Sequence, residues 1–364
     1  MKLVEFIKNN DDWEKVLSSS PYYIQIKRHD GYIIFNYNQL FSDFNLEIVR
    51  ECRGCILKED GFKPVCVAFY KFGNYKESYV PDIDWASATT QEKVDGTIIK
   101  VWHDNGWHVS TNGSINASYC DIHKSNLTNQ TCPYSTYGEL FEIAKNNAGL
   151  NFDSLNKNYT YIFELVGPYN KVVVSYDKTE IYHIGTRDLT TMQELDIDIG
   201  VKKPKVYPLN DLQACVESAK NLPFNAEGYV VVDKFYNRVK IKSPSYVKFH
   251  HLKHNSSPNT SHIIELLKEN ELAEFLTYFP EYSNWVQKIK DKLEQVVFYM
   301  QQELNKIKEM QFSSKKDFAF YVTKLNNYAF YFAWYHNKNI TPKAWLYSLP
   351  TKNLVQILGE EESE

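Results

Sequence analysis

The sequence predicts an α+β protein in which antiparallel sheets occupy residues 1–250 and an all-α domain occupies residues 251–364. Short runs of alternating apolar and polar residues, separated by tight-turn signals, predict the sheets. From Trp285 to Ile307 apolar residues recur every three or four positions, which predicts a long amphipathic helix. At 364 residues the chain is long enough for two domains with separate cores.

Turn and cap signals place the elements of the first domain. His29-Asp30-Gly31 and Asp104-Asn105-Gly106 each predict a β-hairpin. Helices are expected within residues 2–18, over 137–147 with Ser135 or Thr136 as cap, and over 211–220. The expected strands are 22–28, 32–37, 55–57, 64–72, 97–103, 107–111, 161–166, 171–176, 181–185, 228–232 and 238–242.

Two cap signals support the helical domain. Ser314 and Asp317 resemble a capping box, and Thr341 followed by Pro342 is a typical helix start. The apolar stripe between Trp285 and Ile307 is expected to form the core of this domain. Charge is near neutral here apart from an acidic tail, and all arginines lie before residue 251.

Composition limits the class of protein. The hydrophobic fraction of 43% and the aromatic fraction of 15% fit a folded globular protein. No apolar run is long enough to span a membrane and no signal-peptide pattern is present, so we expect a soluble cytoplasmic protein without a membrane partner. The net charge of −4 means that any nucleic-acid binding depends on local patches. The six cysteines are scattered, and we expect free thiols.

Codon-driven bias is visible in the basic residues. Only five are arginine, whereas Lys, Asn, Ile and Tyr are abundant. This bias fits an AT-rich genome and hints at a phage or virus, in which case the protein would act in the infected cell.

Lys93-Val94-Asp95-Gly96 is the motif that indicates chemistry. A lysine amine attacks a phosphoryl or carbonyl centre only when it is neutral, so a nucleophilic lysine needs a site that lowers its pKa. Gly96 would let the backbone approach a ligand closely, and the Asp95 carboxylate would hold a ligand hydroxyl or order the turn. The alternative is a solvated turn before a strand.

Two carboxylates and a row of cations lie in strands otherwise suited to burial. Glu164 interrupts an apolar run and Glu227 precedes another, and each needs a partner because burying a charge alone is costly. Arg238, Lys240 and Lys242 are spaced two apart, so a strand places them on one face. Structural ion pairs and a solvated basic edge are the alternatives.

The order of these motifs resembles that of the lysine nucleotidyltransferases, which include ATP-dependent ligases and RNA capping enzymes. The closest likeness is to the T-even phage RNA ligase 1 family, and it runs through about the first 250 residues. The motifs that carry it are Glu51-Cys52-Arg53-Gly54, Tyr70-Lys71-Phe72-Gly73-Asn74, Lys93-Val94-Asp95-Gly96, Phe163-Glu164-Leu165-Val166-Gly167-Pro168, Glu227-Gly228-Tyr229-Val230 and Val239-Lys240-Ile241-Lys242-Ser243. Asn112 stands where the family has a lysine.

The resemblance implies a nucleotidyltransferase (adenylation) domain with Lys93 as the catalytic nucleophile. It implies Mg²⁺ as cofactor, with Glu227 as the metal-binding residue. Lys240 and Lys242 would neutralise the α-phosphate and Lys71 the outer phosphates. The implied ATP-binding residues are Tyr37, Arg53, Lys71, Asp95, Gly96, Glu164, Glu227, Lys240 and Lys242.

The function so implied is an ATP-dependent RNA ligase that joins RNA 5′-phosphate and 3′-hydroxyl ends through lysyl-AMP and RNA-adenylate. Its partner would be RNA with such ends, nicked tRNA included, with the helical domain recognising the RNA. Two alternatives remain open. A GTP-dependent RNA capping guanylyltransferase shares the central motifs but would carry a β-barrel after the last of them. A non-catalytic RNA-binding module would need neither Lys93 nor the carboxylates.

Overall fold

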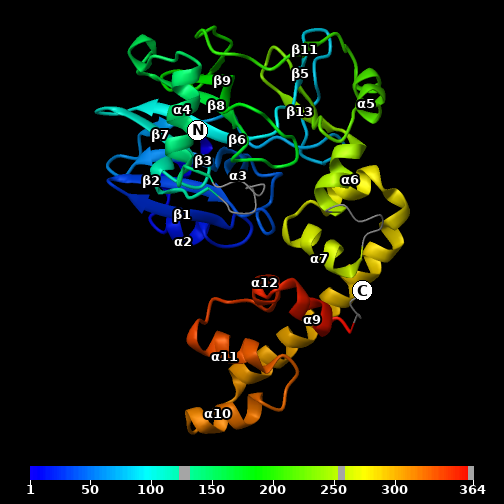
Figure 1. The fold of residues 1–364 in the computed structure, drawn as a ribbon. Helices are drawn as coiled ribbons and strands as arrows, with labels where there is room; N and C mark the ends of the chain where they lie inside the picture. The colour runs from blue at the N-terminus through cyan, green and yellow to red at the C-terminus, as the bar shows by residue number, and fades with distance from the viewer. Residues whose placement is uncertain (123–131, 253–258, 360–364) are drawn as a thin grey trace. The chain divides into compact units, whose positions relative to one another are not determined.

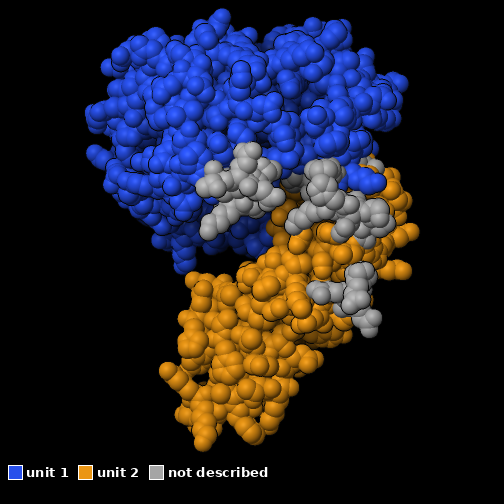
Figure 2. Space-filling model, in the orientation of Figure 1, with its two compact units in different colours: residues 1–253 blue, residues 254–364 orange. Residues whose placement is uncertain are grey.

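The computed structural model of the protein describes residues 1–122, 132–252 and 259–359 (Figure 1). The chain divides into two compact units, Met1–Lys253 and His254–Glu364 (Figure 2). The sheets lie in the first unit, and the described part of the second unit consists of helices.

The first sheet is a four-stranded antiparallel meander in the order β1-β2-β3-β4. Asp30 and Gly31 both have positive φ, 49° and 78°, and they form the tight turn that joins the first two strands. Three short helices supply apolar side chains to the same core. The elements are α1 (Lys2–Asn9), α2 (Trp13–Leu17), β1 (Ile24–His29), β2 (Tyr32–Tyr37), α3 (Glu47–Glu51), β3 (Arg53–Lys58) and β4 (Pro64–Cys66).

The second sheet has five antiparallel strands in the order β10-β9-β8-β6-β7. Helix α4 (Tyr137–Asn147) packs on it through Leu140, Phe141 and Ala144. A reciprocal capping box between Thr136 and Glu139 starts this helix. The strands are β6 (Thr97–His103), β7 (Trp107–Thr111), β8 (Tyr159–Val166), β9 (Glu180–Asp188) and β10 (Glu194–Leu195).

The third sheet, in the order β11-β5-β12-β13, carries the motifs of greatest chemical interest. Helix α5 (Leu212–Lys220), capped by Asp211, covers one face and buries Cys215 and Ala219 against the strands. Helix α6 (Pro244–Leu252) follows the last strand. The strands are β5 (Thr89–Glu92), β11 (Val206–Tyr207), β12 (Gly228–Val232) and β13 (Arg238–Lys242).

Two expected strands differ from the structure. Residues 171–176 form a loop, because the N–H groups of Val173 and Val174 donate to the Asp95 carboxylate instead of to a neighbouring strand. The strand expected over 64–72 ends at Cys66, after which the chain continues without regular structure. The first loop lies beside the Lys93 motif, and the second contains the Lys71 motif. The alternation of apolar residues does not predict either loop.

The second unit is built around α9 (Ser283–Glu309), which buries the expected apolar stripe, including Ile289, Leu293 and Leu304. Ser314 and Thr341 cap their helices as predicted, although no reciprocal bond from Asp317 completes a capping box. No helix of the described residues has the length and apolar character to cross a membrane. The other helices are α7 (Thr260–Lys268), α8 (Leu272–Tyr278), α10 (Lys315–Val322), α11 (Tyr328–His336), α12 (Pro342–Ser348) and α13 (Thr351–Ile357).

Candidate active site

Lys93 lies directly after strand β5, where the chain leaves the third sheet. Its N–H donates to the Gly228 carbonyl at 2.9 Å, which fixes the lysine beside the start of β12. Its Nζ lies 2.6 Å from Glu227 Oε2, and Lys242 Nζ lies 3.5 Å from Glu227 Oε1. The Glu227 side chain is only 4% exposed. One buried carboxylate therefore holds two ammonium groups, which offsets the cost of burying them.

Lys93 lines a small pocket of about 120 Å³. The predicted residues Arg53, Glu164 and Lys240 line it as well. These residues come from three different sheets, on strands β3, β8 and β13. Apolar side chains, among them Phe72 and Val230, complete the walls. An apolar pocket with a few converging charged groups is the usual form of a nucleotide or substrate site.

Arg53 lines this pocket, and part of its guanidinium group is buried. Its Nε and Nη1 atoms are buried and have no hydrogen-bond partner among the described residues. Its guanidinium lies 4.7 Å from the ring centre of Phe69 and 5.5 Å from that of Phe72. Because a buried donor without a partner is costly, such a guanidinium is suited to receive an anionic ligand.

Glu164 has the most strongly perturbed carboxyl group of the pocket. Burial raises its pKa to about 8, an effect that the Lys93 ammonium opposes and that the Glu227 carboxylate reinforces. Near neutral pH the Glu164 carboxyl group is therefore largely protonated and can donate a hydrogen bond. Such perturbed groups cluster at functional sites.

The cation row predicted on one strand face is present on β13. Its middle member, Lys240, extends its Nζ to 5.2 Å from the Phe72 ring centre, and its backbone bonds to Gly73 and Tyr75. Lys242 lies at the end nearest Lys93 and contacts Glu227. Arg238, at the other end, forms an ion pair with Glu194. The row thus extends from the lysine motif to the wall of a second pocket.

Asp95 and Gly96 face the protein interior. Asp95 is 5% exposed, and its carboxylate accepts hydrogen bonds from the N–H groups of Val173 and Val174 and from the Tyr246 hydroxyl, all within 2.9 Å. A Cβ on Gly96 would lie 2.3 Å from the Leu165 carbonyl oxygen. Of the two roles considered for Asp95, the geometry fits ordering of the turn. The close approach that Gly96 permits is to strand β8.

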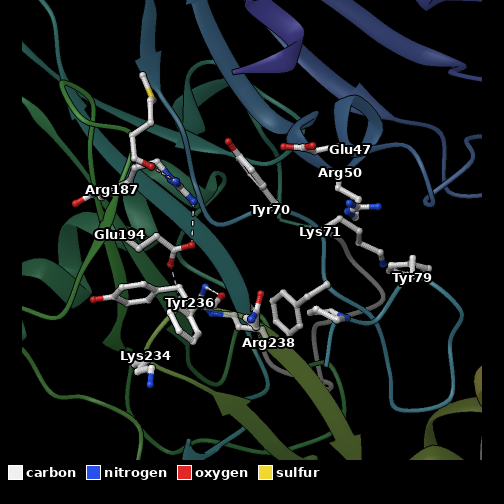
Figure 3. Close-up of a pocket in the computed structure, with 16 residues that line it drawn as sticks. Glu47, Arg50, Tyr70, Lys71, Tyr79, Arg187, Glu194, Lys234, Tyr236 and Arg238 are labelled. Carbon is white, nitrogen blue, oxygen red and sulfur yellow. Dashed lines mark hydrogen bonds and ion pairs between the residues drawn. The ribbon is translucent and has the colours of Figure 1, made fainter. Parts of the chain in front are cut away.

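Tyr37 and Lys71 lie apart from the Lys93 pocket. Lys71 Nζ lies 5.5 Å from the ring centre of Tyr37 and 5.1 Å from that of Phe44. Lys71 lines a second pocket of about 630 Å³, which shares Phe72 and Arg238 with the Lys93 pocket. Figure 3 shows Arg50 and Lys71 on one side of this second pocket and Arg187 and Glu194 on the other.

An arginine–glutamate network supports both pockets and was not predicted from the sequence. Glu194 Oε1 lies 2.9 Å from Arg187 Nη2, and Glu194 Oε2 lies 2.6 Å from Arg238 Nη2, with all three side chains at most 8% exposed. Together the two pockets collect four of the five arginines of the chain. Because the chain has only five arginines, their positions in the sequence could have indicated the residues of these pockets.

Lys100 is a second feature that sequence reasoning missed. It is fully buried on β6, and its Nζ donates to the carbonyl of Gly54, the residue after Arg53. Burial lowers the pKa of its ammonium group. Asn112 also lies close to Gly54, so that a Cβ at Gly54 would meet both Lys100 and Asn112. A buried amine is therefore present beside the position where the sequence has asparagine and the resembled family has lysine.

A divalent metal would find few protein ligands here. The described residues contain no group of three or more His, Cys, Asp or Glu side chains placed to hold a metal ion. Glu164 lines the pocket, and the Glu227 carboxylate is close enough to raise the pKa of Glu164. One or two carboxylates suit Mg²⁺ only when phosphate oxygens and water complete its coordination.

Comparison with known proteins identifies the family of the chain. The sequence model of the RNA ligase family matches residues 51–246. This range includes Arg53, Lys93, Glu164, Glu227 and the β13 cations. The chain belongs to the RNA ligase family.

The related proteins include viral and phage sequences. An RNA ligase of Rhodothermus phage RM378 is 28% identical, over 74% of this chain and 74% of its own length. A putative bifunctional polynucleotide kinase/RNA ligase of Autographa californica nuclear polyhedrosis virus is 28% identical over 71% of this chain, but this match spans only 39% of the viral protein. A solved Naegleria gruberi RNA ligase with ATP and Mn is 15% identical, over 45% of this chain and 51% of that one, with a TM-score of 0.34.

Proposed function

We propose that the protein is an ATP-dependent RNA ligase that joins RNA 5′-phosphate and 3′-hydroxyl ends, in the repair of RNA such as cleaved tRNA. The observation that carries this proposal is the contact of Lys93 Nζ with the buried Glu227, beside a pocket that Lys93 lines together with Arg53, Glu164 and Lys240. This contact fixes the position of the amine beside the cations of the pocket, which are suited to receive a phosphoryl group.

The first step would join Lys93 to AMP. Its neutral Nζ attacks the α-phosphorus of ATP, the bond from that phosphorus to the bridging oxygen breaks, and pyrophosphate leaves. The β13 cations Lys240 and Lys242 would stabilise the negative charge of the transition state. Positioning and charge neutralisation of this kind account for most of the catalysis in phosphoryl transfer.

Two further transfers would complete ligation. An oxygen of the RNA 5′-phosphate attacks the α-phosphorus, and the bond to Lys93 breaks, which leaves AMP on the RNA. The 3′-hydroxyl of the other end then attacks the former 5′-phosphate, forms the phosphodiester and releases AMP. Glu164, protonated near neutral pH, is placed to donate a hydrogen bond to a ligand in the pocket.

Mg²⁺ fits this site as a cofactor bound together with the nucleotide. Glu227 would hold it, and phosphate oxygens and water would complete the shell. The ion would supply neutralisation of phosphate charge.

Labelling with radioactive nucleotide tests the proposal and its alternatives. Covalent label from ATP but not from GTP, lost in Lys93→Ala, is the expected result. Label from GTP would indicate a capping guanylyltransferase. However, residues 259–359 contain helices where the β-barrel of such an enzyme would follow. Absence of label from either nucleotide would indicate a non-catalytic RNA-binding module.

A further inference from the structure

The second pocket is large enough for a ligand of its own. Its volume of about 630 Å³ lies within the roughly 300–1,000 Å³ typical of ligand sites, whereas the Lys93 pocket, at about 120 Å³, lies below that range. The two pockets adjoin at Phe72 and Arg238. A ligand in the second pocket would therefore lie next to the nucleotide on which the chemistry takes place.

The charge of the second pocket favours an anion. Two carboxylates, Glu47 and Glu194, face five cations, which are Arg50, Lys71, Arg187, Lys234 and Arg238. Glu194 is shared by two of the arginines, so this network keeps an excess of positive charge. The whole chain is negative, at −4, and this pocket is therefore a local positive field of the kind that binds a phosphate backbone.

The walls of the pocket are also rich in aromatic rings. Tyr70, Tyr79, Phe235 and Tyr236 all line it. Phe235 is 66% exposed, an unusual state for a phenylalanine. Cations interleaved with accessible rings are the common feature of proteins that bind single-stranded nucleic acid, because bases stack on the rings while cations contact the backbone.

Hydrogen bonds to Asp233 fix the backbone of the turn that presents Phe235. The buried Asp233 carboxylate accepts hydrogen bonds from the N–H groups of Phe235 and Asn237 at 2.9 Å and from the N–H of Asp84 at 3.1 Å. Tyr236 completes the turn in the left-handed region, with φ of 62°. The ring of Phe235 is thus held at the solvent surface by its backbone, which reduces the entropy that a ligand must remove on stacking.

We propose that the second pocket binds one nucleotide of the single-stranded RNA substrate, with Phe235 as the surface on which its base stacks. Arg50 would contact the adjoining phosphate. Lys71, which the resemblance assigns to the outer phosphates of ATP, lines the same pocket. This assignment rests on the proposed function and adds an RNA subsite to it. The outer phosphates of ATP are the competing occupant, but a triphosphate makes no use of the aromatic walls.

Binding of a fluorescent 5′-phosphorylated single-stranded oligoribonucleotide, measured by anisotropy, tests the assignment without catalysis. Phe235→Ala should weaken binding by about tenfold, because stacking of one base on an aromatic ring is lost. Phe235→Trp should restore it. Phe224→Ala, which removes a half-exposed phenylalanine outside this pocket, is the control and should leave affinity unchanged.

A second measurement separates RNA from ATP. The KM for ATP in covalent labelling should stay within about twofold in Phe235→Ala, since stacking of the RNA base is not part of that step. An RNA affinity unchanged in Phe235→Ala would overturn the assignment. An increase in KM for ATP that matches the loss of RNA affinity would give the pocket to the triphosphate instead.

The two ends of the RNA can be distinguished by repeating the binding measurement with a 5′-hydroxyl oligonucleotide. A loss of affinity seen only with the 5′-phosphate would place the donor end in the pocket, and an equal loss with both would place the acceptor strand there. Labelling of the unaltered protein by ATP reports on the proposed function separately. If ATP does not label the unaltered protein but Phe235→Ala still weakens RNA binding, the pocket is an RNA-binding site and the proposed ligase function is wrong.

Discussion

The two units of the chain differ in the charged side chains that their described residues bury. The first unit buries Glu51, Asp95, Lys100, Glu227 and Asp233, each at most 5% exposed. In the described part of the second unit, the buried polar side chain is His262, and the core is the apolar stripe of α9. All five arginines belong to the first unit.

This difference indicates which unit is suited to carry out a reaction. Burial of a charge costs several kcal/mol unless a partner offsets it, so a fold selected for stability alone would avoid it. The first unit satisfies most of its buried charges with ion pairs and backbone donors, but Arg53 retains buried nitrogens without a partner. We infer that the first unit carries the reaction and that the second contributes binding surface.

The strongest test of this division is Lys93→Ala. We expect covalent labelling by ATP to fall below detection, because the first step needs this amine as nucleophile. Sealing of RNA that already carries a 5′-adenylate should persist. Substantial labelling of the variant, measured by gel autoradiography, would place the nucleophile elsewhere.

Next in size are the lysines of β13. Lys240→Ala and Lys242→Ala should each slow adenylation by at least about tenfold, or roughly 1.4 kcal/mol, because each removes a charge that stabilises the reacting phosphate. Lys248→Ala, at an exposed site on α6, is the matched control. Rates near normal in both strand variants would make this strand a solvated basic edge.

A smaller effect concerns the pH dependence of stability. Burial raises the pKa of Glu164 to about 8, so its contribution to the free energy of unfolding is complete below pH 4.5 and is lost as the pH rises toward 8. Relative to the unaltered protein, Glu164→Gln should therefore gain on the order of 1 kcal/mol between pH 5 and pH 9, less than full burial would give because solvent screens the carboxylate. Urea denaturation at several pH values measures this.

A control keeps the Glu164 result specific. Glu5→Gln, at an exposed carboxylate on α1, should leave the pH profile unchanged. Parallel profiles for Glu164→Gln and the unaltered protein would mean that the buried carboxyl does not titrate in this range.

The smallest expected effect comes from removal of the helical unit. A chain that ends at Lys253 should still form lysyl-adenylate, because the residues proposed for that step precede this point. Its rate of sealing a nicked tRNA stem-loop, relative to a simple single strand, should fall about threefold, since recognition of folded RNA depends on shape and phosphate contacts. Lys315, Lys316 and Lys324 could supply such contacts. An unchanged ratio would make the helical unit a scaffold.

Local sequence signals predicted most elements of the fold. The hairpins at residues 30–31 and 104–106, the strands 97–103 and 107–111 and the helix 137–147 occur as predicted. Such elements depend on contacts between near neighbours, namely turn residues with positive φ, caps and alternating burial. The loop at 171–176 was wrongly predicted as a strand because its backbone donors bind Asp95, a residue far away in the chain.

The candidate site also combines residues that local sequence patterns indicate with residues that only the tertiary structure brings together. The motifs by themselves predicted Lys93, Glu164, Glu227 and the β13 cations as site residues, and their roles stay predictions. Glu164 drew attention because a charge inside a strand suited to burial is visible in the residue pattern. Only the tertiary structure decided that Asp95 would order a turn, that Lys71 would line a second pocket and that Glu194 would join two arginines. These outcomes depend on strand register and on the packing of three sheets, and a linear sequence does not state which distant side chains meet.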